Sequence, residues 1–375
     1  MTTSLREKLA QFQADLPLDR ARTIPALWYF DAELYAAECR WVFGQSLQVA
    51  CRIEQVAEPG SFATMEIAGE PMVVVRGREP GFQDLRAFFN VCRHRAARVV
   101  NEPSGTASRL RCRYHGWTYD LAGRLIGTPE FDGVVDFSRE ANSLVPVSVD
   151  TWGKWVWVHL GPNPVPLGEF LAPLLAHPSF LDLESLHFVD RREYVVACNW
   201  KVFVDNYLDG GYHVNTVHPG LAGVLDYSRY RTEIHGQTAL QTSPTAPATD
   251  QAISSVRSGT AYYWWTFPNF MLNVYAGVMD TNLVLPMGPD RCRVRFDFYF
   301  SETAGDGARR FIEKSMAVAD EVQMEDIAIC EEVQRGLASR SFSTGRFSVR
   351  REAAGFQFHR LLVDRLCAGI AGSTS

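Results

Sequence analysis

Two short arms, each holding one cysteine and one histidine, constrain this chain more than any other feature. The first arm is Cys92-Arg93-His94, and the second is Cys112-Arg113-Tyr114-His115. A [2Fe–2S] cluster of mixed ligation needs two thiolates for one iron and two imidazoles for the other. A structural zinc site also accepts two cysteines and two histidines. In zinc fingers, however, the two cysteines usually lie close together in the sequence, and so do the two histidines. The spacing therefore favours the cluster, with Cys92, His94, Cys112 and His115 as its ligands, and leaves zinc as the alternative.

The overall composition bears on partners and compartment. A formal net charge of −6 argues against a nucleic-acid-binding surface. The sequence has no run of eighteen apolar residues, so we expect no membrane span. Residues 1–25 mix acidic and basic side chains without a continuous apolar core, which argues against a secretion signal. Eight cysteines in 375 residues do not suggest a disulfide framework, so we expect reduced thiols and a cytoplasmic location.

The length of the chain indicates more than one domain, because single cores rarely grow to this size. Residues 1–45 read as an N-terminal helical segment, 46–160 as a β-rich domain holding both arms, and 161–375 as a mixed catalytic domain. Within the last part, the polar segment 236–259 is expected to be a loop. Strands and one long helix are expected, from their apolar patterns, at 62–67, 72–76, 155–158, 192–197, 260–267, 270–275, 283–285, 293–300 and 307–337.

A second metal site is expected because an isolated cluster transfers electrons but does not itself make or break bonds in a substrate. Two histidines and one carboxylate on one face of Fe(II) leave positions open for oxygen and substrate. His213 and His218 would lie about 140° apart on an ideal helix, so the helix must be distorted or end there, as Gly210-Gly211 allows. Asp326 is the expected third ligand because it lies in an apolar helical pattern, whereas its neighbour Glu325 fits a solvated helix face.

Over nearly its whole length the chain resembles the α subunits of Rieske non-haem iron oxygenases, and within that family the members that act on choline. The resemblance rests on the two arms with their flanking residues and on the stretches 199–213, 268–271, 279–286 and 322–337. It implies an α+β chain in which a β-rich Rieske [2Fe–2S] domain precedes a catalytic domain of antiparallel sheet covered by helices. It also implies that His213, His218 and Asp326 bind a mononuclear Fe(II) and that O₂ is the co-substrate.

The resemblance further implies a homotrimer, in which the cluster of one subunit lies nearer the mononuclear iron of a neighbour. A carboxylate shortly before the first iron histidine usually bridges the two centres in this family. Here Gly210 stands three residues before His213, so Asp209 is the expected bridge and Asp205 the second choice. Asn206 lies in the same stretch and is counted with them as a candidate catalytic residue.

Dense aromatic residues suggest where a substrate would bind. A quaternary nitrogen is held by the faces of aromatic rings, and alternate residues of a strand face opposite sides. We therefore expect Tyr263, Trp265, Phe267 and Tyr275 to line a cation site, with ordinary core packing as the alternative for each ring. Tyr119, just beyond the second arm, is either a hydrogen-bond donor to a cluster sulfur or a core tyrosine.

The leading expected reaction is hydroxylation of choline to betaine aldehyde hydrate. Oxidative N-demethylation of glycine betaine or a related quaternary amine is a close alternative, and hydroxylation of an aromatic ring a more distant one. A Rieske electron carrier without catalysis is disfavoured, because a carrier needs no second metal site. No G-x-G-x-x-G follows an expected strand, so electrons are expected from a separate ferredoxin or flavin reductase.

Overall fold

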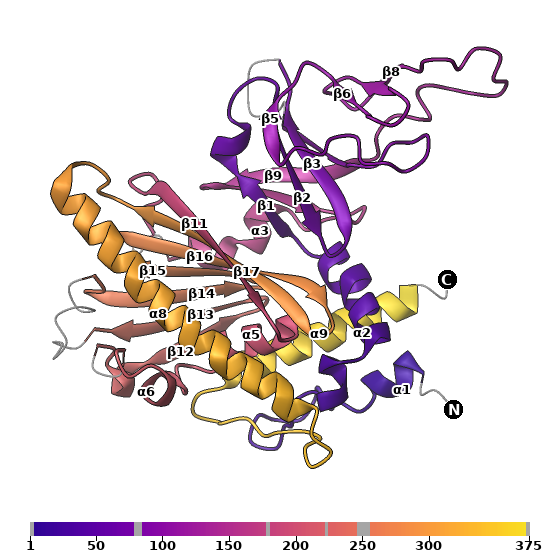
Figure 1. Cartoon of the computed structure of the whole chain (residues 1–375). Helices are drawn as coiled ribbons and strands as arrows, with labels where there is room; N and C mark the ends of the chain where they lie inside the picture. The colour runs from indigo at the N-terminus through magenta and orange to yellow at the C-terminus, as the bar shows by residue number, and fades with distance from the viewer. Residues whose placement is uncertain (1–3, 79–84, 178–180, 222–223, 246–255, 373–375) are drawn as a thin grey trace. The chain divides into compact units, whose positions relative to one another are not determined.

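The computed structural model describes residues 4–78, 85–177, 181–221, 224–245 and 256–372 (Figure 1). The chain forms two compact units, which are described separately. One unit is continuous, Phe43–Glu169, and the other joins Met1–Val42 to Phe170–Ser375. The N-terminal segment packs on the end of the chain within this second unit, where the Ile24 N–H donates to His359 Nδ1 at 3.2 Å.

The continuous unit is built on a seven-stranded antiparallel sheet with the order β1-β10-β9-β4-β3-β2-β5. Its β2–β3 hairpin turns through Ala68-Gly69, where both residues have positive φ, as a two-residue hairpin loop requires. A smaller sheet, β6-β7-β8, lies in the connection between β5 and β9. The strands are β1 (Gln48–Arg52), β2 (Ser61–Ile67), β3 (Glu70–Arg76), β4 (Leu85–Phe89), β5 (Ser104–Thr106), β6 (Leu110–Arg111), β7 (Thr118–Tyr119), β8 (Leu125–Gly127), β9 (Pro146–Trp152) and β10 (Trp155–His159).

The second unit is built on another seven-stranded antiparallel sheet, with the order β11-β17-β16-β15-β14-β13-β12. The order from β17 to β12 follows the chain, so each of these strands pairs with its neighbour in sequence. The expected loop at 236–259 is wrong in part, because Thr238–Pro244 forms β13, held by ladders to β12 and β14; residues 246–255 lie outside the described part. The strands are β11 (His187–Val196), β12 (Arg231–His235), β13 (Thr238–Pro244), β14 (Thr260–Thr266), β15 (Phe270–Tyr275), β16 (Val278–Gly288) and β17 (Arg291–Phe300).

Helices cover this sheet and carry the candidate metal ligands. The 33-residue helix α8 runs obliquely across the sheet (Figure 1) and contacts α5, α6 and β11, while α9 contacts α5 and β12. The α-helices are α1 (Leu5–Leu9), α2 (Ala32–Ala37), α3 (Leu167–Phe170), α4 (Ala172–Leu175), α5 (Trp200–Tyr207), α6 (Val214–Val217), α8 (Gly305–Leu337) and α9 (Ala353–Gly372). Shorter helical turns are η1 (Ala26–Tyr29), η2 (Glu38–Val42), η3 (Phe43–Gln45), η4 (Ile53–Val56) and η7 (Tyr227–Arg229).

A buried ion pair fixes α5 within its unit. Lys201 Nζ lies 2.6 Å from Glu38 Oε1, and both side chains are fully buried. The Trp200 indole N–H donates to the other oxygen of Glu38 at 2.7 Å. Since α5 also carries Asn206, this polar core helps to position the candidate site described below.

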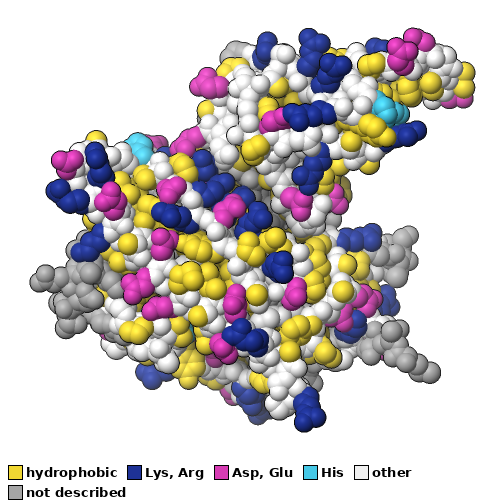
Figure 2. Space-filling model, viewed as in Figure 1, with side chains coloured by type: hydrophobic (Ala, Val, Ile, Leu, Met, Phe, Trp, Pro, Cys, Tyr) yellow, Lys and Arg dark blue, Asp and Glu magenta, His cyan; other side chains and the backbone are white. Residues whose placement is uncertain are grey.

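The surface is mixed in charge. On the face shown in Figure 2, acidic and basic side chains are interspersed over each unit. Within the described ranges, none of the helices combines the length and the apolar character needed to cross a membrane.

Candidate metal centres and active-site cavity

The two cysteine–histidine arms share one local structure. In each arm the cysteine carbonyl accepts from the N–H four residues on: Ala96 N–H to Cys92 O at 3.0 Å, and Gly116 N–H to Cys112 O at 3.1 Å. Each cysteine N–H donates in turn to the carbonyl one residue further, at 2.8 and 2.9 Å. Ala96 and Gly116 both have positive φ, 57° and 72°. The arms are therefore matching tight loops, and each presents one thiol and one imidazole.

The four expected cluster ligands come together at the tips of these loops. Cys92 and Cys112 are buried, and the ring centroids of His94 and His115 lie 4.6 Å apart. Nδ1 of His94 is buried and has no hydrogen-bond partner in the described part of the chain. A buried imidazole nitrogen left without a partner is costly unless it binds something. Two thiols and two imidazoles in this arrangement fit a mixed-ligand [2Fe–2S] cluster.

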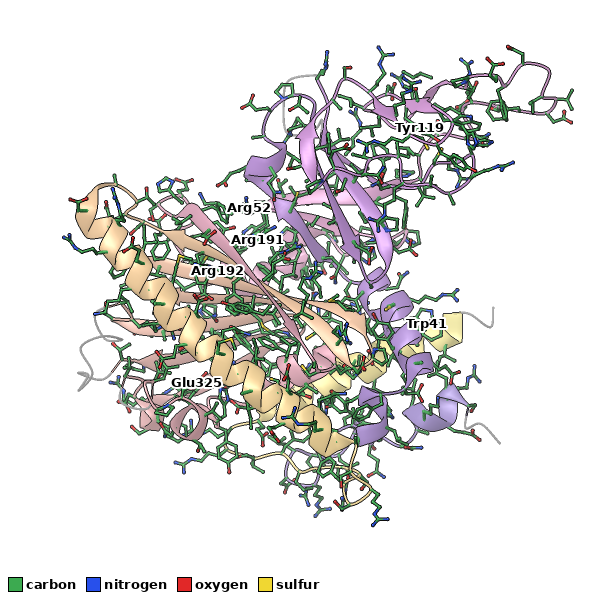
Figure 3. The ribbon with its side chains drawn as sticks, in the orientation of Figure 1. Trp41, Arg52, Tyr119, Arg191, Arg192 and Glu325 are labelled. Atoms are coloured by element: carbon green, nitrogen blue, oxygen red, sulfur yellow. The ribbon has the colours of Figure 1, made fainter. Side chains whose placement is uncertain are left out.

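Two aromatic side chains support this cluster site. Tyr119, labelled in Figure 3, accepts the Arg93 N–H at 3.0 Å, and its hydroxyl oxygen lies 3.5 Å from Cys92 Sγ. Because the amide already donates to this hydroxyl, the hydroxyl proton is free to point at the sulfur. The Trp117 ring stacks on His94 at a centroid distance of 4.9 Å, with 9° between the planes. Tyr119 is thus placed to tune the cluster, and Trp117 to hold the imidazole plane.

His213, His218 and Asp326 converge in the second unit. His218 Nε2 lies 3.1 Å from His213 Nε2 and 3.2 Å from Asp326 Oδ1, and the third separation is 3.7 Å. Ligands about 2.1 Å from one metal and at right angles to each other lie about 3 Å apart. Burial lowers the pKa of His218, but the carboxylates of Asp326 and Glu325 raise it by more. The group favours a positive charge and fits a divalent metal ion.

The backbone explains how histidines five residues apart meet. His213 and His218 are the cap residues at the two ends of α6, a helix of one turn, so no continuous helix separates them. Gly210 and Gly211, between α5 and α6, have φ of 69° and 70°. A Cβ at Gly210 would lie 2.2 Å from the carbonyl oxygen of Arg351, so only glycine fits there. The expected interruption of the helix is therefore present, and it places both imidazoles on one site.

Each histidine is held through its second nitrogen by a carboxylate. His213 Nδ1 lies 2.6 Å from Asp209 Oδ2, and His218 Nδ1 lies 2.7 Å from Glu325 Oε2. Glu325 lies on α8 (Figure 3), and its side chain is 29% exposed while its carboxylate contacts His218, so a solvated helix face describes only part of its surroundings. Carboxylates in this position fix the tautomer and the ring orientation of metal-bound histidine. The adjacency of Glu325 to Asp326 is the one signal in the sequence that could have indicated this contact.

The three residues expected near the bridge lie in different surroundings. Asn206 donates from Nδ2 to Asp326 Oδ1 at 2.7 Å, so it orients a candidate ligand. Asp205 instead accepts from the Tyr29 hydroxyl at 2.7 Å and contacts His359 Nε2 at 2.9 Å. Asp209 touches His213 directly. Of the two aspartates, only Asp209 contacts a candidate metal ligand; its bridging role stays a prediction.

A cavity of about 100 Å³ adjoins the three candidate iron ligands. An apolar cavity of about 150 Å³ holds a benzene molecule, so the volume indicates a small ligand. Four tyrosines are among the residues that line the cavity: Tyr207, Tyr230, Tyr263 and Tyr275. Tyr263 is central, with ring centroids 6.0 to 6.4 Å from the other three.

Only two of the four residues expected to form the cation site lie at the cavity. Tyr263 and Tyr275 line the cavity, whereas Trp265 and Phe267 do not. Trp265 and Phe267 are almost fully buried and pack on Phe358 of α9, at centroid distances of 5.8 and 6.4 Å. Trp265 shares the face of β14 that Tyr263 occupies, but α9 covers it. Strand alternation alone could not distinguish a cavity from the underside of a helix.

Two charged residues of the cavity were not anticipated. Asp280, on β16, accepts a hydrogen bond from Asn273 Nδ2 at 2.7 Å. Burial raises the pKa of Asp280 to about 6, although Arg257 and Asn273 act to lower it. Arg257 precedes β14, and no sequence pattern marks it. An acid among apolar neighbours in an expected strand, as in Val278-Met279-Asp280, is the signal that could have indicated Asp280.

Two family models match the chain. Residues 46–138 match the Rieske [2Fe-2S] domain, and residues 183–368 match the ring hydroxylating alpha subunit (catalytic domain). The chain is 36% identical to the chloroplastic choline monooxygenase of Arabidopsis thaliana, covering 97% of this chain and 87% of the relative. It is 30% identical to the carnitine monooxygenase oxygenase subunit of Escherichia coli K12, covering 92% and 94%.

Solved structures agree with these matches. The quaternary ammonium Rieske monooxygenase CntA in complex with L-carnitine superimposes with a TM-score of 0.79 at 27% identity, covering 94% of this chain and 98% of that one. Naphthalene 1,2-dioxygenase from Rhodococcus sp. superimposes with a TM-score of 0.75 at 19% identity, covering 97% and 99%, which is a likeness of fold.

These comparisons confirm the expected α+β fold, with a Rieske domain and a helix-covered antiparallel sheet. They also confirm the expected cofactors, a Rieske [2Fe–2S] cluster and a mononuclear iron with O₂ as co-substrate, over the zinc alternative. The chain belongs to the Rieske non-haem iron oxygenases, as a relative of choline monooxygenase.

Proposed function

We propose that this chain uses O₂ and electrons from a separate protein to hydroxylate a small quaternary ammonium compound. The observation that carries the proposal is the cavity beside His213, His218 and Asp326, with four tyrosine rings in its wall. A quaternary nitrogen has no N–H to donate, so aromatic faces are its usual partners. The names of the relatives, choline monooxygenase and carnitine monooxygenase, support the same substrate class.

The residues of both centres have separate tasks in this proposal. Cys92, His94, Cys112 and His115 would hold the cluster, and His213, His218 and Asp326 the mononuclear iron. When bound, these groups supply electrons and the activation of O₂. Hydroxylation places one oxygen atom of O₂ in a C–H bond and releases the other as water, with consumption of two electrons and two protons. The buried aromatic and aliphatic side chains of the cavity wall would limit the access of bulk water during this step.

The reaction depends on which bond is presented. Hydroxylation at the carbinol carbon of choline gives betaine aldehyde hydrate, the product favoured by the sequence resemblance. Hydroxylation of an N-methyl group gives a carbinolamine, which breaks into formaldehyde, a tertiary amine and a proton. Hydroxylation of an aromatic ring has less support, because Asp280 and Arg257 place two charged groups in the cavity wall.

The proposal includes partners. A ferredoxin or a flavin reductase would supply the electrons. The solved CntA relative is described with inter-subunit electron transfer, which supports electron transfer between subunits here. By the family resemblance we propose a homotrimer with Asp209 as the bridging carboxylate.

The test uses the iron-loaded chain with a surrogate ferredoxin–reductase pair and NAD(P)H. Oxygen uptake and products would be followed for choline, glycine betaine, carnitine and benzoate, with tetramethylammonium as a competitor. We expect product from at least one quaternary ammonium compound and competitive inhibition by tetramethylammonium. Turnover of benzoate alone would contradict the proposal.

A further inference from the structure

Arg257 is a buried cation that has no counter-ion among the described residues. Its side chain is 8% exposed and lines the cavity beside the candidate iron ligands. Among the described residues, it forms no hydrogen bond or ion pair, and its one ring contact is with Tyr275, whose ring centroid lies 4.9 Å from the guanidinium carbon. Arginine carries five N–H donors and stays protonated. A buried charge of this kind is costly unless it is paired, so the cavity contains donors in need of an acceptor.

The cavity also contains the opposite charge, held apart from the first. Asp280 lines the same wall and is held by Asn273. Asp280 and Arg257 are both described residues, and they form no ion pair with each other. A small cavity with one acid and one base, each left unpaired by the other, is complementary to a ligand that carries both charges.

We propose that Arg257 binds a carboxylate of the substrate, so that the substrate is a quaternary ammonium carboxylate, a betaine, and not the alcohol choline. This inference rests on the proposed function and narrows it. The guanidinium fork would take the carboxylate through two parallel hydrogen bonds. The quaternary nitrogen would face the Tyr263 ring and Asp280, and its methyl groups would lie toward the iron ligands.

The charge balance gives the physical reason for this preference. Choline carries a cation and a neutral hydroxyl, so it would add a second positive charge to a cavity in which Arg257 is already unpaired. A betaine neutralises Arg257 with its carboxylate and satisfies Asp280 with its ammonium. Because desolvated charges are expensive without partners, a betaine is bound at lower cost.

Glycine betaine and choline form a matched pair for the test. Both carry the same trimethylammonium group. Glycine betaine has a carboxylate where choline has a hydroxymethyl group. Binding would be measured by calorimetry on the metal-loaded chain without oxygen, and turnover by coupled O₂ uptake. The variants are Arg257→Gln and the charge-keeping Arg257→Lys. Arg231→Gln, an exposed substitution on β12, is the control.

Hydrogen bonds to a charged group account for roughly tenfold to a hundredfold in affinity. We expect glycine betaine to bind more tightly than choline by a factor in this range. Arg257→Gln should remove this preference: glycine betaine loses the partner of its carboxylate and binds more weakly, whereas choline no longer meets an unpaired positive charge and binds at least as tightly as to the parent. Arg257→Lys should retain part of the preference, and Arg231→Gln all of it.

Three outcomes would overturn the inference. One is tighter binding of choline than of glycine betaine by the parent chain. Another is an equal loss of both ligands in Arg257→Gln with unchanged metal content and thermal midpoint, which would make Arg257 a packing residue against Tyr275. The third is an unchanged preference in Arg257→Gln. Failure of both compounds and of tetramethylammonium to bind at all would instead contradict the proposed function, so the two failures are distinct.

Discussion

His218 and Glu325 are 107 residues apart in the chain, yet His218 Nδ1 lies 2.7 Å from Glu325 Oε2. This contact joins the end of α6 to the middle of α8. By accepting a hydrogen bond from Nδ1–H, the carboxylate leaves Nε2 with its lone pair directed at the metal position. Asp209 makes the same contact with His213 at 2.6 Å, so both imidazoles are oriented from behind.

Removing the charge of Glu325 should weaken the metal site. Glu325→Gln can still accept a hydrogen bond, but it no longer makes the imidazole more basic. Loss of such an outer partner typically lowers metal affinity by roughly 10- to 100-fold. The measurement is iron retention against a chelator, followed over time. Glu332→Gln, on an exposed residue of α8 that pairs with Arg335, is the control, and equal retention in both variants would contradict the role of Glu325.

Asp209→Asn tests the proposed bridge. The amide keeps the size of the side chain, but it weakens the support of His213 as Glu325→Gln does that of His218. We therefore expect the mononuclear iron to bind less tightly, and the variant is compared with the parent at matched iron occupancy. Without the carboxylate, electron delivery from the cluster to the mononuclear iron should slow. Single-turnover kinetics of the reduced protein measure this step. An unchanged rate, with both centres present, would move the bridging role to Asp205 or elsewhere.

The buried ion pair between Lys201 and Glu38 should govern the stability of the second unit. Lys201→Met leaves Glu38 charged and buried, which should cost about 3 to 5 kcal/mol in free energy of unfolding. Lys8→Met is the matched control, because Lys8 pairs with Asp31 near the surface, where such pairs contribute about 1 kcal/mol or less. Thermal midpoints of the two variants would show the difference. Equal shifts of the thermal midpoint would mean that the buried pair contributes no more to stability than the surface pair.

Asp280 should make stability fall as pH rises. Its pKa is raised to about 6 by burial, so between about pH 4 and pH 6 the folded chain keeps a proton that the unfolded chain releases. The resulting loss in free energy of unfolding should reach about 3 kcal/mol above pH 6 and vanish below about pH 4. Asp280→Asn should remove this contribution, so its thermal midpoint should exceed that of the parent above pH 6 and match it near pH 4. Parallel pH profiles for the two proteins would refute this assignment.

Local patterns predicted most of what rests on local chemistry. The four cluster ligands could be predicted because each thiol lies close in sequence to an imidazole. The glycines before His213 likewise indicated the turn that brings the two histidines together. The β13 strand was missed because its residues are polar, and only pairing with β12 and β14 makes them a strand. Glu325 and Arg257 were missed for a related reason: their contacts depend on tertiary packing that no spacing encodes. Trp265 lies on the same face of β14 as the cavity residue Tyr263, but α9 covers it.

The most direct test of the account is substrate-dependent O₂ consumption by the iron-loaded parent chain and by Asp326→Ala. With a quaternary ammonium compound present, the account predicts O₂ uptake that matches hydroxylated product in the parent. In Asp326→Ala it predicts loss of mononuclear iron and of uptake, while the visible spectrum of the cluster is retained. Full coupled uptake in Asp326→Ala, or uptake in the parent with an aromatic acid alone, would contradict the account.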